Sequence, residues 1–213
     1  MPAQDLSKLI KWLMQEPWGG FLQDIMGLHL GPAMTAFELE FEEIDDVLGG
    51  MWGATLWGVA FEDALTRRLD GRTPVDAYLE RRGWTESTGT KRYLAALQTS
   101  VMSLYEVSEL TPGQSFRARD LLRGGEPVLV SERSASRTLK TWDRIAARLV
   151  PQGDRIVLSG GLLAFTPEGC ELLAEALRDA ASPRKRRRSR PPPLTWTGTE
   201  DGLREAAPLF TLA

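Results

Sequence analysis

The segment Phe116-Arg-Ala-Arg119 decides the fold of the second half of the chain, because apolar and charged side chains alternate along it. A period of two places Phe116 and Ala118 on one face of a β-strand and the two arginines on the other. Similar short runs lie at about 103–110, 115–121, 127–131, 143–150 and 155–165. Turn residues separate these runs, and Gly160-Gly161 is expected to bend or bulge the last one. Short strands at this spacing predict a small antiparallel β-barrel-like unit.

The first hundred residues have the period of helices instead. Two sets of apolar residues each line one helical face: Leu6, Leu9, Ile10 and Leu13, and then Trp57, Phe61, Ala64 and Leu65. Thr73-Pro74 predicts the start of a helix that ends at Arg82, and another helix is expected near 88–99. The segment 37–48 fits both alternation and helical spacing, and we favour a helix that ends at Gly49-Gly50.

Together these patterns predict an α+β protein: a helical N-terminal region, a small antiparallel β-barrel-like unit and a C-terminal helix. The expected divisions are an acidic helical region at 1–100, the barrel-like unit with its packed helix at 101–181, a basic Pro/Arg linker at 182–193 and a short tail at 194–213. Thr166-Pro167 begins the packed helix, whose buried face is expected to hold Leu172, Leu173, Ala176, Leu177 and Ala180. The apolar ending Leu209-Phe-Thr-Leu-Ala213 indicates docking onto the body or truncation of a longer chain.

The composition argues against several classes of protein. The single cysteine, Cys170, cannot form an internal disulfide, and no basic-then-apolar leader is present, so a cytoplasmic location is expected. The longest uncharged run, residues 47–61, is shorter than the about 20 apolar residues that cross a bilayer, so no membrane partner is expected.

The residue types for catalysis and metal binding are scarce. The chain has one histidine, His29, and one cysteine, and it lacks phosphate-cradling and nucleophile motifs. No metal, no cofactor and no enzymatic activity are therefore expected, and His29 is interpreted as a core residue. A cleft that holds His29 beside two carboxylates would instead favour an enzyme. The acidic run 38–46 could supply oxygen ligands for Mg²⁺ or Ca²⁺, but it lacks the pattern of a calcium-binding loop. We favour a solvated helix face or a patch that meets a basic partner, for which the basic half of this same chain is one candidate.

Charge is unevenly distributed along the chain. Residues 1–80 hold 5 Lys/Arg and 14 Asp/Glu, whereas residues 81–192 hold 20 and 12. The predicted barrel contributes Arg117, Arg119, Arg123, Arg133, Arg137, Lys140, Arg144 and Arg148. The linker adds Arg184, Lys185, Arg186, Arg187, Arg188 and Arg190. Guanidinium groups suit phosphate oxygens and stack on bases, so these fourteen residues are the predicted nucleic-acid contacts, with Trp142 or Phe116 exposed beside them.

Two interpretations of the barrel arginines stay open at this point: they converge on a polyanion, or they pair with the acidic N-terminal half. The first predicts a non-catalytic module that binds RNA or single-stranded DNA. The alternative is a protein-interaction or regulatory module whose helical half docks a partner, which a large apolar patch near Trp12, Trp18 or Trp52 would favour. The sequence leaves the oligomeric state open.

Five stretches together resemble a cassette in a family of uncharacterised bacterial proteins: Ser103-Leu-Tyr-Glu-Val107, Arg119-Asp-Leu-Leu-Arg-Gly-Gly-Glu126, Val130-Ser-Glu-Arg-Ser-Ala-Ser136, Trp142-Asp-Arg-Ile-Ala-Ala-Arg148 and Ser159-Gly-Gly161. Some of those proteins carry a Cys-rich metal-binding tail of the SEC-C type. The resemblance implies a bacterial cytoplasmic protein. The tail motif is absent here, so no metal site carries over from it.

Overall fold

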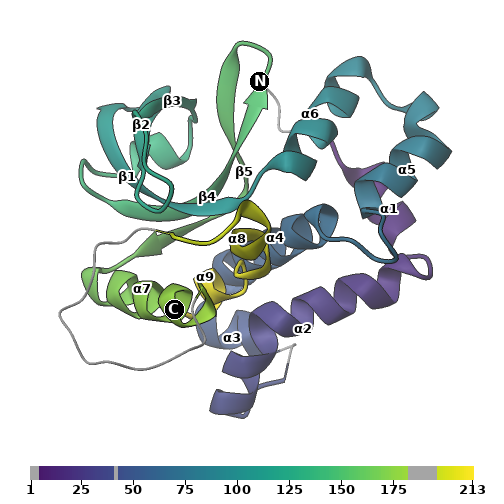
Figure 1. The fold of residues 1–213 in the computed structure, drawn as a ribbon, viewed down its shortest axis with the longest axis horizontal. Coiled ribbons are helices and arrows are strands. Elements are labelled where there is room, and N and C mark those ends of the chain that lie inside the picture. Colours follow the sequence, from purple (N-terminus) through teal and green to yellow (C-terminus); the bar gives the residue numbers. More distant parts are fainter. Residues whose placement is uncertain (1–4, 41–42, 182–195) are drawn as a thin grey trace.

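The computed structural model describes residues 5–40, 43–181 and 196–213. It is an α+β fold in which a five-stranded barrel packs against helices from both ends of the chain (Figure 1). The helices before the barrel are α1 (Ser7–Leu13), α2 (Trp18–Phe37), α3 (Ile44–Leu48), α4 (Gly50–Thr66), α5 (Pro74–Arg82) and α6 (Thr88–Thr99). Those after it are α7 (Pro167–Ala181), α8 (Glu200–Glu205) and α9 (Leu209–Leu212). No helix in the described ranges has the length and apolar character needed to cross a membrane.

The N-terminal helices form where capping and periodicity predict them. Thr73 caps α5 in a reciprocal capping box with Asp76, and Ser87 caps α6 through the backbone N–H of Thr90. Their apolar faces join α1, α2 and α4 in one core, in which Trp12 and Trp18 are buried together with Leu65 and Leu97. Burial of these side chains, more than helix propensity, holds short helices such as α1 in place.

The predicted continuous helix over 37–48 is wrong. Helix α2 ends at Phe37, and Glu38 takes up a left-handed conformation with φ 53° while the N–H of Leu39 bonds to the Met34 carbonyl. A residue in that conformation terminates a helix because its N–H turns back onto the last turn. Helix α3 begins at Ile44 and ends at Leu48, directly before Gly49 as predicted, and Gly49, with φ 84°, separates α3 from α4.

The strands are β1 (Met102–Thr111), β2 (Ser115–Asp120), β3 (Val128–Ser131), β4 (Arg144–Gln152) and β5 (Arg155–Phe165). They close a barrel in the order β1-β2-β3-β5-β4. All pairings are antiparallel except that of β3 with β5, in which Val130 lies opposite Ile156. The barrel is therefore mixed rather than purely antiparallel, because the connection between β3 and β4 carries the chain across the barrel and brings β5 beside β3 in the same direction.

Side chains alternate between the inside and the outside of the barrel. Phe116 and Ala118 of β2 point inward and pack with Tyr105, Val107, Val130 and Ile145. Phe116 is thus fully buried, and the expectation that it could lie exposed beside the arginines is wrong. Trp142, with φ 77°, is 70% exposed just before β4.

The Gly160-Gly161 bulge lets α4 cross closely over β5. The register of β4 and β5 shifts between Ala146 and Arg148, as expected for a bulge. A Cβ on Gly161 would lie 2.4 Å from the Thr55 carbonyl oxygen, and one on Gly160, at φ 60°, would lie 2.4 Å from the Glu62 carboxyl carbon. Only glycine permits this approach of helix and strand.

The C-terminal helices cover the outer side of the barrel, below it in Figure 1. Cys170, Leu173 and Leu177 form the buried face of α7, whereas Leu172 and Ala180 are exposed, so the expected face was too wide. The apolar ending packs onto the body: Phe210 of α9 is buried, and the Thr211 hydroxyl donates to the His29 carbonyl.

Candidate nucleic-acid interface

A groove of about 1740 Å³ runs between the barrel and the N-terminal helices. On the barrel side it is lined by the β1–β2 turn, strand β3, the connection that follows β3, the β4–β5 turn and the first half of β5. On the helical side it is lined by α1, α4 and Tyr93 of α6. The groove thus joins segments that are more than a hundred residues apart in the sequence.

Two predicted arginines, Arg133 and Arg137, line this groove from the β3–β4 connection. The Ser136 hydroxyl accepts from the N–H of Gly113, whose φ of 75° lets the β1–β2 turn lie against the Arg137 guanidinium. Within the described ranges neither guanidinium forms an ion pair. Arg155 of the β4–β5 turn, which the sequence analysis did not select, lines the same groove beside Asp154, at 3.9 Å.

The groove is lined by the carboxyl groups of Asp5, Glu62, Glu132 and Asp154 as well as by the guanidinium groups of Arg133, Arg137 and Arg155. Asp5 and Glu132 are engaged locally: Asp5 accepts from the N–H of Ser7, and Glu132 accepts from the N–H groups of Ser134 and Ala135. Asp154 lies beside Arg155. Of the three arginines that line the groove, Arg133 and Arg137 have no carboxylate partner among the described residues, and these two are available for an anion.

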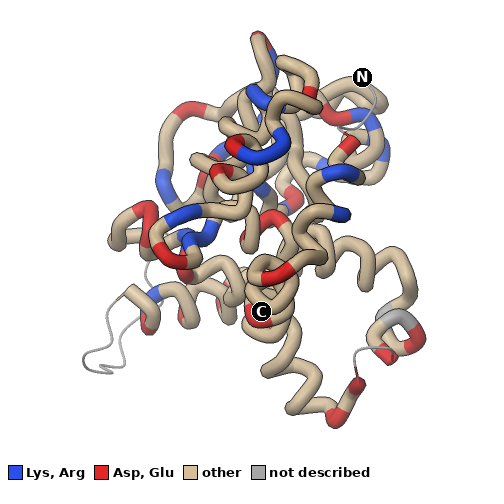
Figure 2. The backbone as a smooth tube through the Cα atoms, turned by 90° about the vertical axis from the view of Figure 1, so that its right-hand side faces the viewer, with Lys and Arg blue, Asp and Glu red and all other residues tan. Residues whose placement is uncertain are grey.

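The other barrel cations lie elsewhere. Arg117 pairs with Glu109, Arg119 with Glu106 and Arg123 with Asp120, all carboxylates of the barrel itself, and Arg123 also lies 3.7 Å from Glu200 of α8. Lys140 and Arg144 form no ion pair in the described part of the chain, and they do not line the groove. Figure 2 shows Lys and Arg distributed over the barrel and the neighbouring helices rather than gathered in one strip, whereas the long helix α2 carries none.

The prediction that Arg148 contacts nucleic acid is wrong, because its guanidinium is buried and cannot reach a ligand on the surface. Its side chain is 2% exposed; it donates to Asp63 Oδ1 at 3.1 Å and to the Ser100 carbonyl at 2.9 Å. Arg148 thus pairs with the acidic half, as the alternative interpretation expected. Arg184, Lys185, Arg186, Arg187, Arg188 and Arg190 lie outside the described residues.

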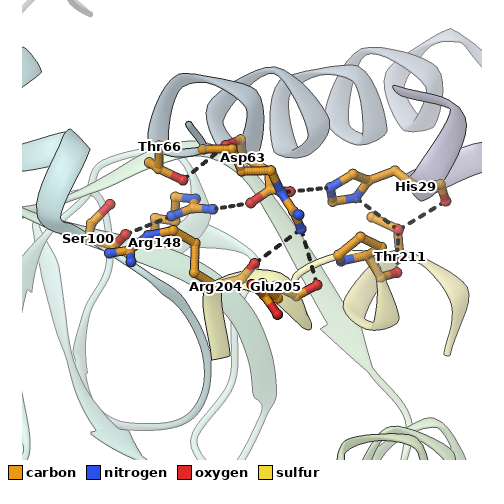
Figure 3. Close-up of polar contacts among 10 residues, drawn as sticks. His29, Asp63, Thr66, Ser100, Arg148, Arg204, Glu205 and Thr211 are labelled. Carbon is orange, nitrogen blue, oxygen red and sulfur yellow. Dashed lines mark hydrogen bonds and ion pairs between the residues drawn. The ribbon is translucent and has the colours of Figure 1, made fainter. Parts of the chain in front are cut away.

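Asp63 is the centre of a buried polar junction between the helices and the barrel (Figure 3). Its Oδ2 accepts from Arg67 Nε at 2.6 Å and lies 3.1 Å from His29 Nε2, while Oδ1 accepts from Arg148. Burial alone would raise the pKa of Asp63, but the hydrogen bond from His29 and the charges of Arg148 and Arg67 outweigh it, so the pKa is lowered. His29 Nδ1 also lies within hydrogen-bond distance, 3.1 Å, of the Thr211 hydroxyl oxygen.

This junction confirms that His29 is a core residue with its polar atoms satisfied. The histidine and Asp63 are both fully buried, and neither lines the groove. A general base has to reach a substrate, so this buried pair is not the cleft with His29 and two carboxylates that would favour an enzyme. Its chemistry is that of a structural clamp that holds α2, α4, β4 and the C-terminal helices together.

Helix α4 lines the helical wall of the groove with Trp57, Gly58, Phe61 and Glu62. The rings of Trp57 and Phe61 stack at 4.8 Å and 11°. Glu62 Oε1 accepts a short hydrogen bond from the Ser159 hydroxyl, which in turn bonds to the Tyr93 hydroxyl. Burial raises the pKa of Glu62 to about 7, even though the Ser159 bond and the charge of Arg148 act in the opposite direction.

The acidic run and the expected apolar patch lie at the far end of the helical region. The described side chains of the run, Glu38, Glu40, Glu43 and Asp46, are exposed, and none forms an ion pair with the basic half; Glu42 and the side chain of Asp45 lie outside the described set. No group of metal-ligand residues occurs in the described part of the chain. Trp12 and Trp18 are buried, whereas Phe37, Val47, Met51 and Trp52 are exposed near the acidic residues.

The fold and the groove define a class: a mixed five-stranded barrel with a helical flank that forms a groove along β3 and β5. The chain belongs to a family of unknown function, DUF7986, whose model matches residues 65–190. The match covers the barrel side of the groove, while Trp57 and Glu62 precede it. Neither the curated proteins nor the solved structures contain a significant match to the chain.

Sequence analysis missed the residues of the helical wall. Trp57 was selected only as an apolar member of a helical face, and Glu62 and Ser159 carry no motif. The Gly160-Gly161 pair was the one available signal, because glycine within a strand marks a bulge or a close approach of another element. It predicted the bulge but could not reveal that α4 is the element that approaches.

Proposed function

We propose that this protein is a non-catalytic module that binds single-stranded nucleic acid, RNA or DNA, in the groove between the barrel and the N-terminal helices, and that it works in the cytoplasm. The observation that supports this most is the position of Arg133 and Arg137, which have no described carboxylate partner and line a groove that also contains an aromatic side chain. Arginines and aromatic platforms within one groove are common in proteins that bind single strands.

The architecture of the barrel supports the same proposal. The barrel resembles the OB fold, a five-stranded Greek-key barrel that binds oligonucleotides and oligosaccharides over strands 2 and 3 and the loops between strands 1 and 2 and strands 4 and 5. The groove of this protein is lined by β3 and by the two corresponding loops, at Gly113–Ser115 and Gln152–Arg155. This likeness concerns the fold, and the arginines supply the argument for a polyanion.

The basic linker is proposed to add phosphate contacts to those of the groove. Six cations on a single strand would give a slope of the logarithm of affinity against the logarithm of salt of about −4, whereas the two groove arginines would contribute about −1.4. The linker is therefore expected to supply most of the salt dependence, and the groove to fix the position of the strand.

The test is a titration of the full chain with a fluorescently labelled single-stranded oligonucleotide, followed by anisotropy at about 50 and about 200 mM salt. The double variant Arg133→Ala/Arg137→Ala is expected to bind more weakly and with a salt slope that is shallower by about 1.4. The matched control is Arg81→Ala/Arg82→Ala, which removes the same charge from exposed positions on α5. Equal affinities and slopes for the groove variant and the wild type would remove the groove from the proposal.

The second candidate function is the docking of a protein partner, and the exposed residues Phe37, Val47, Met51 and Trp52 favour it. Phe37 is 74% and Met51 83% exposed, and the acidic side chains of the run lie close by in the sequence. Exposed apolar side chains with carboxylates close by in the sequence suit a basic amphipathic helix as partner. Calorimetry with a designed Leu/Lys helix and a Leu/Glu control would show binding of the basic peptide alone, and Met51→Glu would weaken it.

A further inference from the structure

The helical wall of the groove differs in chemistry from its barrel wall. The barrel wall carries the arginines, whereas the helical wall, formed by α1, α4 and α6, presents the aromatic ring of Trp57 and the carboxyl group of Glu62. Phosphates have no reason to approach a carboxyl group, so a different part of the ligand belongs here.

Trp57 has the properties of a stacking platform. Its indole is half-buried and lines the groove, and Phe61, one turn further along α4, stacks on it in a nearly parallel arrangement. Phe61 therefore covers one face of the indole and fixes its plane. A fixed aromatic plane beside a groove binds a planar base at a low cost in conformational entropy.

Glu62 has the properties of a hydrogen-bonding group directed by its neighbours. Ser159 donates to Glu62 Oε1, so the Tyr93 hydroxyl has to donate to Ser159, and both hydroxyl protons point toward the carboxyl group. Of the hydrogen bonds in the described ranges, none involves Oε2. Gly160 lacks the Cβ that would collide with this carboxyl group, so the strand leaves room for Glu62 at the wall of the groove.

We infer that the helical wall of the groove holds one nucleobase, which stacks on Trp57 and donates an N–H to Glu62 Oε2 while the flanking phosphates lie toward Arg133 and Arg137. This inference rests on the proposed binding of single-stranded nucleic acid. It adds that bases, and not only phosphates, are bound. A carboxylate acceptor is the usual partner for the amino group of cytosine, which makes an oligocytidine strand a suitable first probe.

The test compares an oligocytidine strand with an abasic strand of the same length and phosphate count, both titrated into the full chain. The wild type is expected to prefer the base-containing strand by about 5- to 150-fold, the factor that stacking of one base on an aromatic side chain provides. Trp57→Leu is expected to lose most of this preference while its affinity for the abasic strand stays unchanged, and Trp57→Phe is expected to restore part of it. Glu62→Gln keeps the shape and volume of the side chain. It is expected to reduce the preference for oligocytidine, because an amide group replaces the carboxylate that accepts the hydrogen bond.

The two proposals fail in different ways in this experiment. If the abasic strand binds as tightly as oligocytidine, the base pocket is overturned and phosphate binding in the groove stands. If neither strand binds, both proposals fall. If cytidine monophosphate binds as tightly as the strand, the pocket takes free nucleotides and its assignment to a strand is overturned. A cooperative unfolding transition for each variant shows that the altered chain is folded.

Discussion

Replacement of Asp63 by asparagine is expected to cost this protein a large part of its stability. The carboxylate accepts hydrogen bonds from Arg67, Arg148 and His29, and neither its side chain nor that of His29 is exposed. In the Asp63→Asn variant, Arg148 loses its carboxylate partner while its guanidinium remains buried. Breaking a buried ion pair from one side costs about 3–5 kcal/mol, because the remaining charge is left uncompensated.

The control is an ion pair of the same chemistry on the surface. Arg117 and Glu109 are 41% and 73% exposed and lie 2.9 Å apart, so Glu109→Gln is expected to cost less than about 1 kcal/mol. Urea unfolding followed by circular dichroism gives the free energy of unfolding of both variants. If Asp63→Asn costs no more than the surface control, the junction is not a clamp and the reasoning from burial is wrong.

The same junction has a pH dependence with a definite sign. Because the folded state lowers the pKa of Asp63 below its usual 3.8, the stability from this carboxylate is complete above that pH. It is lost as the pH falls through the lower, folded-state value. The Asp63→Asn variant lacks this component of acid unfolding, and its stability is expected to change less than that of the wild type at the acidic end of the titration.

Glu62 behaves in the opposite way: its pKa rises from 4.5 to about 7 on folding, so the folded state loses about 3 kcal/mol as the pH rises from about 4.5 to about 7, and then no more. Glu62→Gln removes this loss, and its free energy of unfolding relative to the wild type is expected to increase over that range; a constant difference would contradict the burial of an ionisable group here. Gly161→Ala is expected to destabilise by about 1–3 kcal/mol, because its Cβ would lie 2.4 Å from the Thr55 carbonyl oxygen, whereas Gly27→Ala, with open space around it in α2, is expected to stabilise by up to about 1 kcal/mol. Thermal unfolding of the two glycine variants measures both, and equal effects would show that α4 and β5 are not in tight contact.

Local structure was largely predictable from the sequence, because it depends on near neighbours. The Thr73-Pro74 start of α5 and the strand with Phe116 and Ala118 inside follow from capping and from a period of two, and both are found as expected. The prediction of a continuous helix over 37–48 failed because near neighbours were ambiguous there: helical spacing and alternation both fit the segment. The left-handed Glu38 that interrupts the helix has no local signature.

The candidate site was predictable only in part, because it depends on distant contacts. The sequence marked Arg133 and Arg137 as cations of the barrel half, but it marked Arg148 equally, and nothing local separates an arginine that lines a groove from one that pairs with a carboxylate 85 residues away. The wall formed by Trp57 and Glu62 was hidden for the same reason, since both residues fit an ordinary amphipathic helix.

The amino-acid sequence by itself determined the elements, the class of fold and the surplus of arginine in the second half, because hydrophobic periodicity, capping and turn residues act over a few positions. Only the tertiary structure decided which charges are buried and which line the groove. The parallel pairing of β3 with β5 and the crossing of α4 over the Gly160-Gly161 bulge bring distant segments together, and burial, ion pairing and pKa all follow from that proximity.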